Sequence, residues 1–384
     1  MLDGWLASER ERVTLLQKKR DVFVIGGGPA GLAAAIAARR RGFAVTVADG
    51  AGPLIDKACG EGLMPATQEA LGSLGVELPA SLGYRFKGIR FLEQTVEVAA
   101  DFPQGRGIGI RRTLLHEFLV SEAENSGAEL LWKTPVMGIE SGGVRLSNGF
   151  VPARWIIGAD GGHSRVRRWS ELDSTVANRQ RFAIRRHYRQ RPWSEYAEIY
   201  WGPRVQGYVT PIGSEEVCVV MMGETVEDVE FERALTVLPS LRERLLGAGL
   251  GSRERGAITT MQSLARVWRD NVALVGDASG GVDAITGEGL RLAFQEAAAL
   301  AEAMEHGDLR GYQQAHRRLA RRPLWMGTVL QRLGRYDRLR GRALKLLSSN
   351  RELFARLLAV HVGCATGRDV VAVGAALGWQ LLGS

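Results

Sequence analysis

The sequence predicts an α/β protein in which a parallel sheet is interrupted by antiparallel strands and followed by C-terminal helices. An apolar run at 21–25, an alanine-rich stretch at 33–41 and a second apolar run at 44–48 have the order of a βαβ unit. Two later stretches are rich in β-forming residues and broken by Gly/Pro turns, at 83–102 and 182–222. From residue 290 onward, long segments without such turns predict helices.

Composition narrows the class of protein. The chain has 384 residues, of which 45% are hydrophobic and 24% charged, a balance typical of a globular protein with two joined domains. No apolar run reaches the roughly 18–20 residues that span a bilayer, and no secretory signal is recognisable at the start. We therefore expect a cytoplasmic location. The three cysteines and six histidines are scattered, so we expect neither disulfides nor a metal site.

The first strand ends in a glycine fingerprint, Gly26-Gly27-Gly28-Pro29-Ala30-Gly31. Its glycines permit a tight turn, a close approach of the main chain to a pyrophosphate, and close packing of the helix on the strand. Pro29 suits the first turn of a helix, because its missing N–H would have no partner there. Asp49 follows the second strand, where an acid can bind ribose hydroxyls. Together these residues predict a dinucleotide site.

Two further strand-to-turn motifs lie far along the chain. The first is Gly158-Ala159-Asp160-Gly161, whose aspartate could equally be a simple turn cap. The second is Gly276-Asp277-Ala278, followed by Thr286-Gly287-Glu288-Gly289 at the start of a predicted helix. The positive end of that helix would stabilise negative charge on a reduced ring system.

These three motifs, in this order, resemble those of the p-hydroxybenzoate hydroxylase-like flavoproteins. The resemblance covers roughly residues 20–300 and implies a Rossmann-type FAD-binding domain with an inserted antiparallel-sheet substrate domain. It implies FAD as cofactor and NAD(P)H as reductant. Asp160 would help to secure FAD, and Asp277 would contact its ribityl chain. Arg112, with Arg111 as alternative, would lie near the chain that links the two halves of FAD, and the Val136 backbone would meet the adenine.

A Cys59-Gly60 pair, three residues after Asp56-Lys57 and combined with the later Thr-Gly-Glu-Gly element, is similar to geranylgeranyl reductases and their relatives. This places Lys57, Cys59 and Gly60 among the expected cofactor contacts. Cys59 is either a redox participant or a small buried residue beside the flavin.

The segments divide the chain into seven parts. The expected parts are an N-terminal extension (1–20), three pieces of the FAD-binding domain (21–82, 111–177, 266–305), two pieces of the substrate domain (83–110, 178–265) and a C-terminal helical region (306–384).

The resemblance leaves more than one activity open. The favoured expectation is a NAD(P)H-dependent monooxygenase that hydroxylates or epoxidises an apolar aromatic, polyketide or lipid-like secondary metabolite through a flavin C4a-hydroperoxide. The alternative is a geranylgeranyl-reductase-like enzyme that saturates isoprenoid C=C bonds. A halogenase and a non-catalytic flavoprotein are less favoured. No protein nucleophile is required, and no catalytic residue is assigned. Five residues are expected to line the substrate pocket, namely Trp193, Tyr200, Trp201, Tyr208 and Pro211.

The net charge of +8 is concentrated near the C-terminus. Residues 309–345 hold ten arginines and Lys345 against one acid, Asp337, with apolar residues between them. Such a segment is either an amphipathic helical pair with a solvated face or a contact surface for an anionic membrane or a phosphorylated partner. Nucleic-acid binding is not expected, because no recognition module accompanies the charge.

Overall fold

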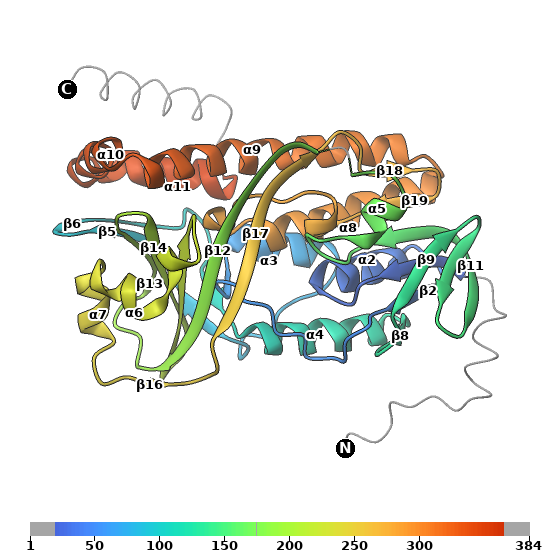
Figure 1. The fold of residues 1–384 in the computed structure, drawn as a ribbon, viewed down its shortest axis with the longest axis horizontal. Coiled ribbons are helices and arrows are strands. Elements are labelled where there is room, and N and C mark those ends of the chain that lie inside the picture. Colours follow the sequence, from blue (N-terminus) through green and yellow to red (C-terminus); the bar gives the residue numbers. More distant parts are fainter. Residues whose placement is uncertain (1–19, 174, 365–384) are drawn as a thin grey trace.

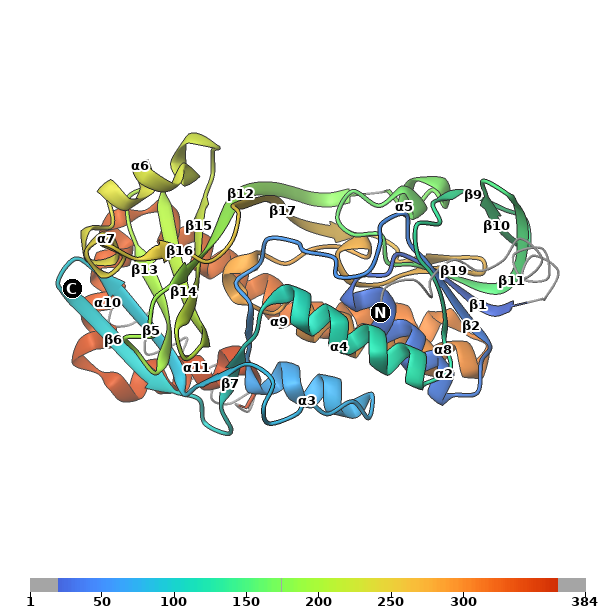
Figure 2. The same ribbon diagram turned by 90° about the horizontal axis from the view of Figure 1, so that it is seen from below.

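The structure is a computed structural model, and it describes residues 20–173 and 175–364. Figures 1 and 2 show an elongated molecule with one sheet toward each end and a layer of C-terminal helices along one side. The expected N-terminal extension lies almost wholly outside the described residues, as do residues 365–384. The α/β class, the mixed antiparallel sheet and the C-terminal helices confirm the predicted fold.

The first sheet is the dinucleotide-type sheet. Its parallel strands, in spatial order, are β19 (Val272–Leu274), β11 (Gly149–Gly158), β1 (Arg20–Ile25), β2 (Val45–Ala48) and β8 (Glu129–Leu131). The antiparallel strand β18 (Trp268–Arg269) borders β19, and β9 (Val136–Glu140) and β10 (Gly143–Leu146) extend β11. Because parallel strands end at one edge, the three motifs that follow β1, β11 and β19 meet there.

Helices bury this sheet. They are α2 (Pro29–Arg40), α4 (Arg112–Asn125) and α8 (Gly289–His306), with α3 (Pro65–Ser73) packed on α8. The middle of β1 is fully buried, as expected for a parallel strand covered on both faces.

The second sheet is antiparallel except for one pair. Its order is β16 (Gly249–Leu250), β12 (Thr175–Arg189), β15 (Glu216–Gly223), β14 (Val205–Gly213), β13 (Tyr196–Trp201), β5 (Gly88–Glu93) and β6 (Val96–Asp101); β5 and β13 run parallel. β17 (Arg255–Leu264) pairs with β12, and these two long strands cross between the sheets in Figure 1. The domain boundaries given above remain a prediction.

Shorter elements complete the fold. A three-stranded sheet joins β3 (Gly62–Leu63), β7 (Gly107–Gly109) and β4 (Tyr84–Phe86). The remaining short helices are α5 (Arg165–Trp169), η1 (Glu227–Val229), α6 (Phe231–Thr236), α7 (Pro239–Arg244), η2 (Gly276–Ala278) and η3 (Ala284–Thr286).

The C-terminal layer consists of α9 (Leu309–Arg335), α10 (Asp337–Ser349) and α11 (Arg351–Val362). Buried residues of α10 and α11 join an apolar cluster with the second sheet, where Phe354 packs on Phe91 at a ring distance of 5.1 Å. Within the described residues, no helix has the length and apolarity needed to cross a membrane.

Candidate active site

One cavity of about 980 Å³ connects the two sheets. It begins at the carboxyl ends of β1, β11 and β19 and continues beneath the C-terminal helices. All but one of the predicted cofactor residues line it: Gly26, Gly28, Pro29, Ala30, Asp49, Lys57, Cys59, Gly60, Arg112, Val136, Asp160, Gly276, Asp277, Gly287 and Gly289. The exception is Gly31, which packs helix against strand: a Cβ there would lie 1.9 Å from the Gly26 oxygen.

The glycine turn after β1 has the shape needed at a phosphate site. Gly26 has φ +112°, and a Cβ there would lie 2.4 Å from the Ala159 oxygen, so this position requires glycine. A Cβ on Gly28, by contrast, would meet no protein atom within 4 Å. Gly28 therefore opens the start of α2 to a ligand, whose negative charge the helix dipole would favour.

Two of the predicted acids also order their own turns. Asp49 accepts the N–H groups of Gly27 and Ala51, each at 2.7 Å. Asp160 accepts the Ser164 hydroxyl at 2.5 Å and the Arg165 N–H at 2.6 Å, so it caps the start of α5. Both carboxylates line the cavity, and their contacts with a cofactor remain a prediction.

The third motif is tied to the loop before β3. Lys57 Nζ lies 2.7 Å from an Asp277 oxygen, although 220 residues separate them. Desolvation in the cavity wall opposes ionisation of Asp277, but the Lys57 charge outweighs it and holds the pKa of this carboxyl below its usual range. Beneath it, the Gly276 N–H donates to the buried Glu296 on α8 at 2.7 Å.

Arg112 and Arg111 have different environments. Arg111 forms a bidentate ion pair with Glu216, whereas Arg112 lines the cavity. The Arg112 Nε is buried without a hydrogen-bond partner among the described residues. One turn further along α4, His116 Nε2 donates to the Gly27 carbonyl at 2.8 Å, and burial lowers the pKa of this imidazole. Sequence analysis did not single out His116, although its i,i+4 spacing from Arg112 places both on one helix face.

The far end of the cavity is apolar. The second sheet contributes Phe91, Ile199 and Tyr208, and β4 of the three-stranded sheet contributes Phe86. The helix α9 contributes Met326, Val329, Leu330 and Leu333. Residues 354, 357 and 358 of α11 close this apolar chamber. The α9 residues have the i, i+3, i+4, i+7 spacing of one helix face, a signal available in the sequence.

Of the five expected substrate residues, the structure brings only Tyr208 to this cavity. Tyr200 and Trp193 instead donate to the buried Glu198, at 2.7 and 2.8 Å. Trp201 packs edge-on against Phe91, and Pro211 lies beyond the cavity wall. Side chains alternate between the two faces of a strand. Tyr200 therefore lies on the face opposite the one that carries Tyr208, and it packs against α6 and α7.

A buried group that the sequence analysis did not assemble lies beside Cys59. Glu61 lines the cavity, and its ligand atoms, those of His187 and those of Cys218 lie within 4.8 Å of one another. Burial raises the pKa of the thiols of Cys59 and Cys218, so both stay protonated at neutral pH. No local pattern links these residues, because 126 positions separate Glu61 from His187.

The residues present fit a dinucleotide cofactor at the motif end. Gly28 offers an open cradle, Arg112 an unpaired buried donor, and the start of α8 at Gly289 borders the cavity without a side-chain cap. These groups are suited to two phosphates and to an anionic ring edge. The apolar chamber beyond them offers no comparable set of donors.

Comparison with known proteins identifies the class. Residues 19–315 match the family model described as "FAD binding domain", and the chain belongs to this family. It is an FAD-dependent oxidoreductase, which confirms the predicted relation to this group of flavoproteins.

The relatives are more informative about the reaction. The chain is 28% identical over 316 residues to a menaquinone reductase of Mycobacterium tuberculosis, covering 75% of this chain and 77% of that one. It is 27% identical to a digeranylgeranylglycerophospholipid reductase of Methanothrix thermoacetophila, covering 75% and 79%. A flavin-dependent monooxygenase of Mycobacteroides abscessus matches at 30% identity, but over only 38% of this chain and 36% of that one.

Among solved structures, the fold is similar to that of a geranylgeranyl bacteriochlorophyll reductase-like protein from Thermoplasma acidophilum. The TM-score is 0.71, the identity is 22%, and the match covers 83% of this chain and 88% of that one.

Proposed function

We propose that this protein saturates carbon–carbon double bonds in the chain of an isoprenoid lipid. The observation that carries this proposal is the apolar chamber of Phe86, Phe91, Leu330 and Leu333, which is continuous with the cofactor end of the same cavity. An apolar cavity wall suits a long hydrocarbon chain and offers little to orient a polar aromatic ring. Menaquinone and digeranylgeranyl lipids, after which the relatives are named, share such a chain.

FAD, bound along the three motifs, would supply a hydride to the substrate, and NAD(P)H would be its reductant. Arg112 and the N–H groups at the start of α2 would hold the diphosphate. Lys57 and Asp277 would fix the ribityl end, and Asp49 and Val136 the adenosine end. The C-terminal helices would exclude water from the chain.

The reductase replaces the monooxygenase as the leading interpretation. Two curated reductases match three quarters of the chain, whereas the monooxygenase matches little more than a third. Oxygenation remains the second candidate, supported by that shorter match at 30% identity.

An anaerobic assay distinguishes the two reactions. Purified protein, FAD and dithionite are incubated with a geranylgeranyl lipid and, separately, with menaquinone, and products are analysed by mass spectrometry. A reductase adds two hydrogens per double bond without oxygen. A product that forms only in air and contains one added oxygen atom would refute the proposal in favour of the second candidate.

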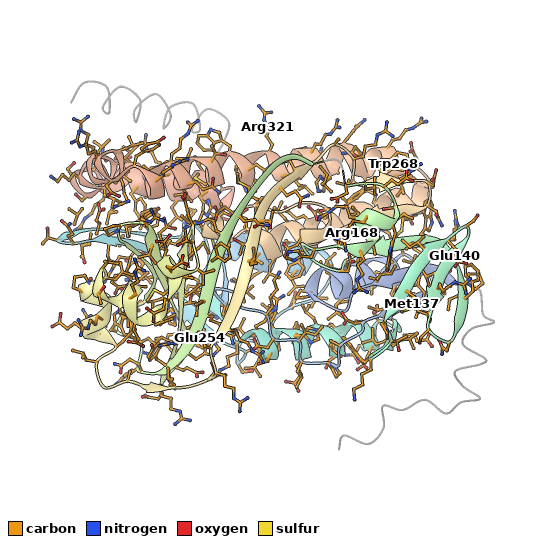
Figure 3. All side chains as sticks on the ribbon, in the orientation of Figure 1. Met137, Glu140, Arg168, Glu254, Trp268 and Arg321 are labelled. Carbon is orange, nitrogen blue, oxygen red and sulfur yellow. The ribbon has the colours of Figure 1, made fainter. Side chains whose placement is uncertain are left out.

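The Arg-rich layer supports a further part of the proposal, which is contact with an anionic membrane. Arg321, Arg332 and Arg335 of α9 are exposed, and Trp325 is 47% exposed on the same helix. Figure 3 shows Arg321 pointing outward from α9, on the side away from the sheets. Basic residues flanking an exposed tryptophan are typical of helices that lie at a lipid surface.

Liposome co-sedimentation tests this contact. We expect binding to vesicles that contain phosphatidylglycerol, loss of binding as salt rises, and no binding to neutral vesicles. The double variant Arg321→Glu/Arg332→Glu should lose binding, and Arg242→Glu, an exposed site on α7, should not. Equal binding by both variants would leave the arginines as a merely solvated face.

A further inference from the structure

Beside the cavity, four ionisable side chains from distant segments form one buried network. Glu61 borders the cavity and has a side chain only 1% exposed. Its φ of +56° is a left-handed conformation that is costly for a non-glycine residue and that concentrates at functional sites. Asp56 precedes it, and β12 contributes Arg185 and His187, both nearly fully buried.

The contacts divide the network into two pairs. Arg185 donates to both oxygens of Asp56, at 2.7 and 3.0 Å, and more distantly to Glu61 Oε1 at 3.1 Å. The hydrogen bond from Arg185 is the main cause that lowers the pKa of Asp56, so Asp56 is ionised and neutralises Arg185. Glu61 Oε1 also accepts from the backbone N–H of Arg112 at 3.0 Å. The other oxygen, Glu61 Oε2, lies 2.7 Å from His187 Nε2.

The second ring nitrogen of His187 is held by Ser252. His187 Nδ1 lies 2.7 Å from the Ser252 hydroxyl, which itself donates to the Arg253 carbonyl at 3.2 Å. Because the Ser252 proton is used in that bond, the hydroxyl accepts from His187 Nδ1–H. The remaining proton of the Glu61–His187 pair, whether Glu61 or His187 carries it, then lies between His187 Nε2 and Glu61 Oε2.

A metal ion is the competing explanation for this cluster, since Glu61, His187 and Cys218 could offer three ligands. Two observations oppose it. The Arg185 guanidinium already lies against the Glu61 carboxylate, and the Cys218 thiol donates to the Cys59 carbonyl at 3.7 Å.

We propose that Glu61 and His187 form the acid of this active site, a dyad that holds one mobile proton and delivers it to the substrate through Glu61. This inference rests on the reductase function proposed above. Glu61 would be the catalytic residue, because it is the member that borders the cavity. His187 and Ser252 are positioning residues, which store the proton and fix the ring tautomer.

The reaction balances with this assignment. One carbon of the double bond gains a hydride, with its electron pair, from reduced FAD, which becomes oxidised. The other carbon gains the proton of the Glu61 carboxyl group, which leaves a Glu61 carboxylate beside neutral His187. Once the product has left, one proton taken up from water restores the mobile proton of the Glu61–His187 pair. The charged and titratable groups around the dyad are Asp56, Cys59, Arg111, Arg112, Arg185 and Cys218.

The first test is independent of turnover. Histidines are labelled with ¹⁵N, and the six ring pairs of the full chain are assigned by single substitutions. We expect neutral His187 to carry its proton on Nδ1, and Ser252→Ala to abolish this preference. A neutral His187 with its proton on Nε2 in the wild type would overturn the assignment, as would one equivalent of transition metal bound through His187.

The second test measures single-turnover reduction of a geranylgeranyl lipid. His187→Gln and Glu61→Gln should lower the rate about 100-fold, the usual size of general acid catalysis, with little change in FAD affinity. Glu61→Asp should restore part of the rate, and added imidazole should rescue His187→Ala. His306→Gln, at an exposed site on α8, is the control and should match the wild type.

The outcomes separate the two proposals. If the wild type reduces no isoprenoid, the proposed function fails, whereas the tautomer experiment still decides whether the dyad exists. If the wild type is active and His187→Gln is as fast, the function stands and the dyad is wrong.

Discussion

The buried carboxyl of Glu296 predicts a specific loss of stability at alkaline pH. Glu296 is 3% exposed on α8 and accepts the Gly276 N–H and the Ser279 hydroxyl, at 2.7 and 3.2 Å. His316 lies 3.3 Å away. Burial raises the pKa of Glu296 from 4.5 to about 8 and lowers that of His316 from 6.5 to about 4. Both groups are therefore neutral at pH 7.

The direction in which stability changes with pH follows from proton linkage. Because the folded protein holds the Glu296 proton more tightly than the unfolded chain, its contribution is fully present below pH 4.5 and is lost as pH rises through about 8. At about 1.4 kcal/mol per pKa unit, the interval corresponds to about 5 kcal/mol, of which about 3 kcal/mol falls between pH 6 and pH 9. This is an upper limit, because water that enters the site would relieve part of the cost.

Glu296→Gln tests this directly, because the amide has the shape of the protonated acid and does not ionise. Urea unfolding is measured from pH 6 to pH 9 for the wild type, Glu296→Gln and Glu302→Gln, an exposed site on the same helix. We expect the free energy of unfolding of Glu296→Gln, relative to that of the wild type, to rise by up to about 3 kcal/mol over this range. The free energy of unfolding of Glu302→Gln should follow that of the wild type. Parallel curves for all three proteins would refute the reasoning.

Three further predictions concern the cavity. Gly28→Ala should fold normally and lose FAD affinity at least about 10-fold, because its Cβ would occupy part of the space proposed for the cofactor. Gly31→Ala should instead lower the melting temperature, because its Cβ would lie 1.9 Å from a backbone oxygen. Fluorescence titration of FAD and thermal melts distinguish the two variants, and equal losses of affinity and of melting temperature in both would contradict this contrast. Asp277→Asn removes the charge that Lys57 faces and should weaken FAD binding by about 10-fold or more, measured by the same titration. Leu330→Trp should fill the apolar chamber and raise KM for a long isoprenoid substrate about 10-fold with FAD affinity unchanged; an unaltered KM would place the chain elsewhere.

Much of the first sheet was predictable because its signals are local. The expected strand at 21–25 is β1 (Arg20–Ile25), and the alanine-rich stretch at 33–41 forms most of α2 (Pro29–Arg40). In both cases apolar periodicity and an adjoining turn or cap fix the element within a few residues of sequence. The meeting of three motifs at one edge also follows, since parallel strands end together.

The substrate end was less predictable because it depends on long-range pairing. Tyr200 and Tyr208 are both aromatic residues of paired strands, yet only Tyr208 reaches the cavity. Which strand face turns toward the cofactor is decided by the packing of distant helices, not by the strand itself. The same holds for Glu61 and His187, which meet only because β12 lies against the loop before β3.

The helix α9 joins the two parts of the proposed function. Its sequence shows an amphipathic pattern, but the pattern alone does not reveal that the apolar face, Met326 to Leu333, is a cavity wall rather than ordinary core. Since a helix with its side chains is about 10 Å across, the apolar chamber and the exposed face of Arg321 are separated by one helix diameter. A lipid chain drawn from a membrane at that face would have a short distance to travel. Substitutions on the two faces should therefore separate: inner changes alter KM for any substrate, and outer changes alter only the use of substrate presented in anionic vesicles.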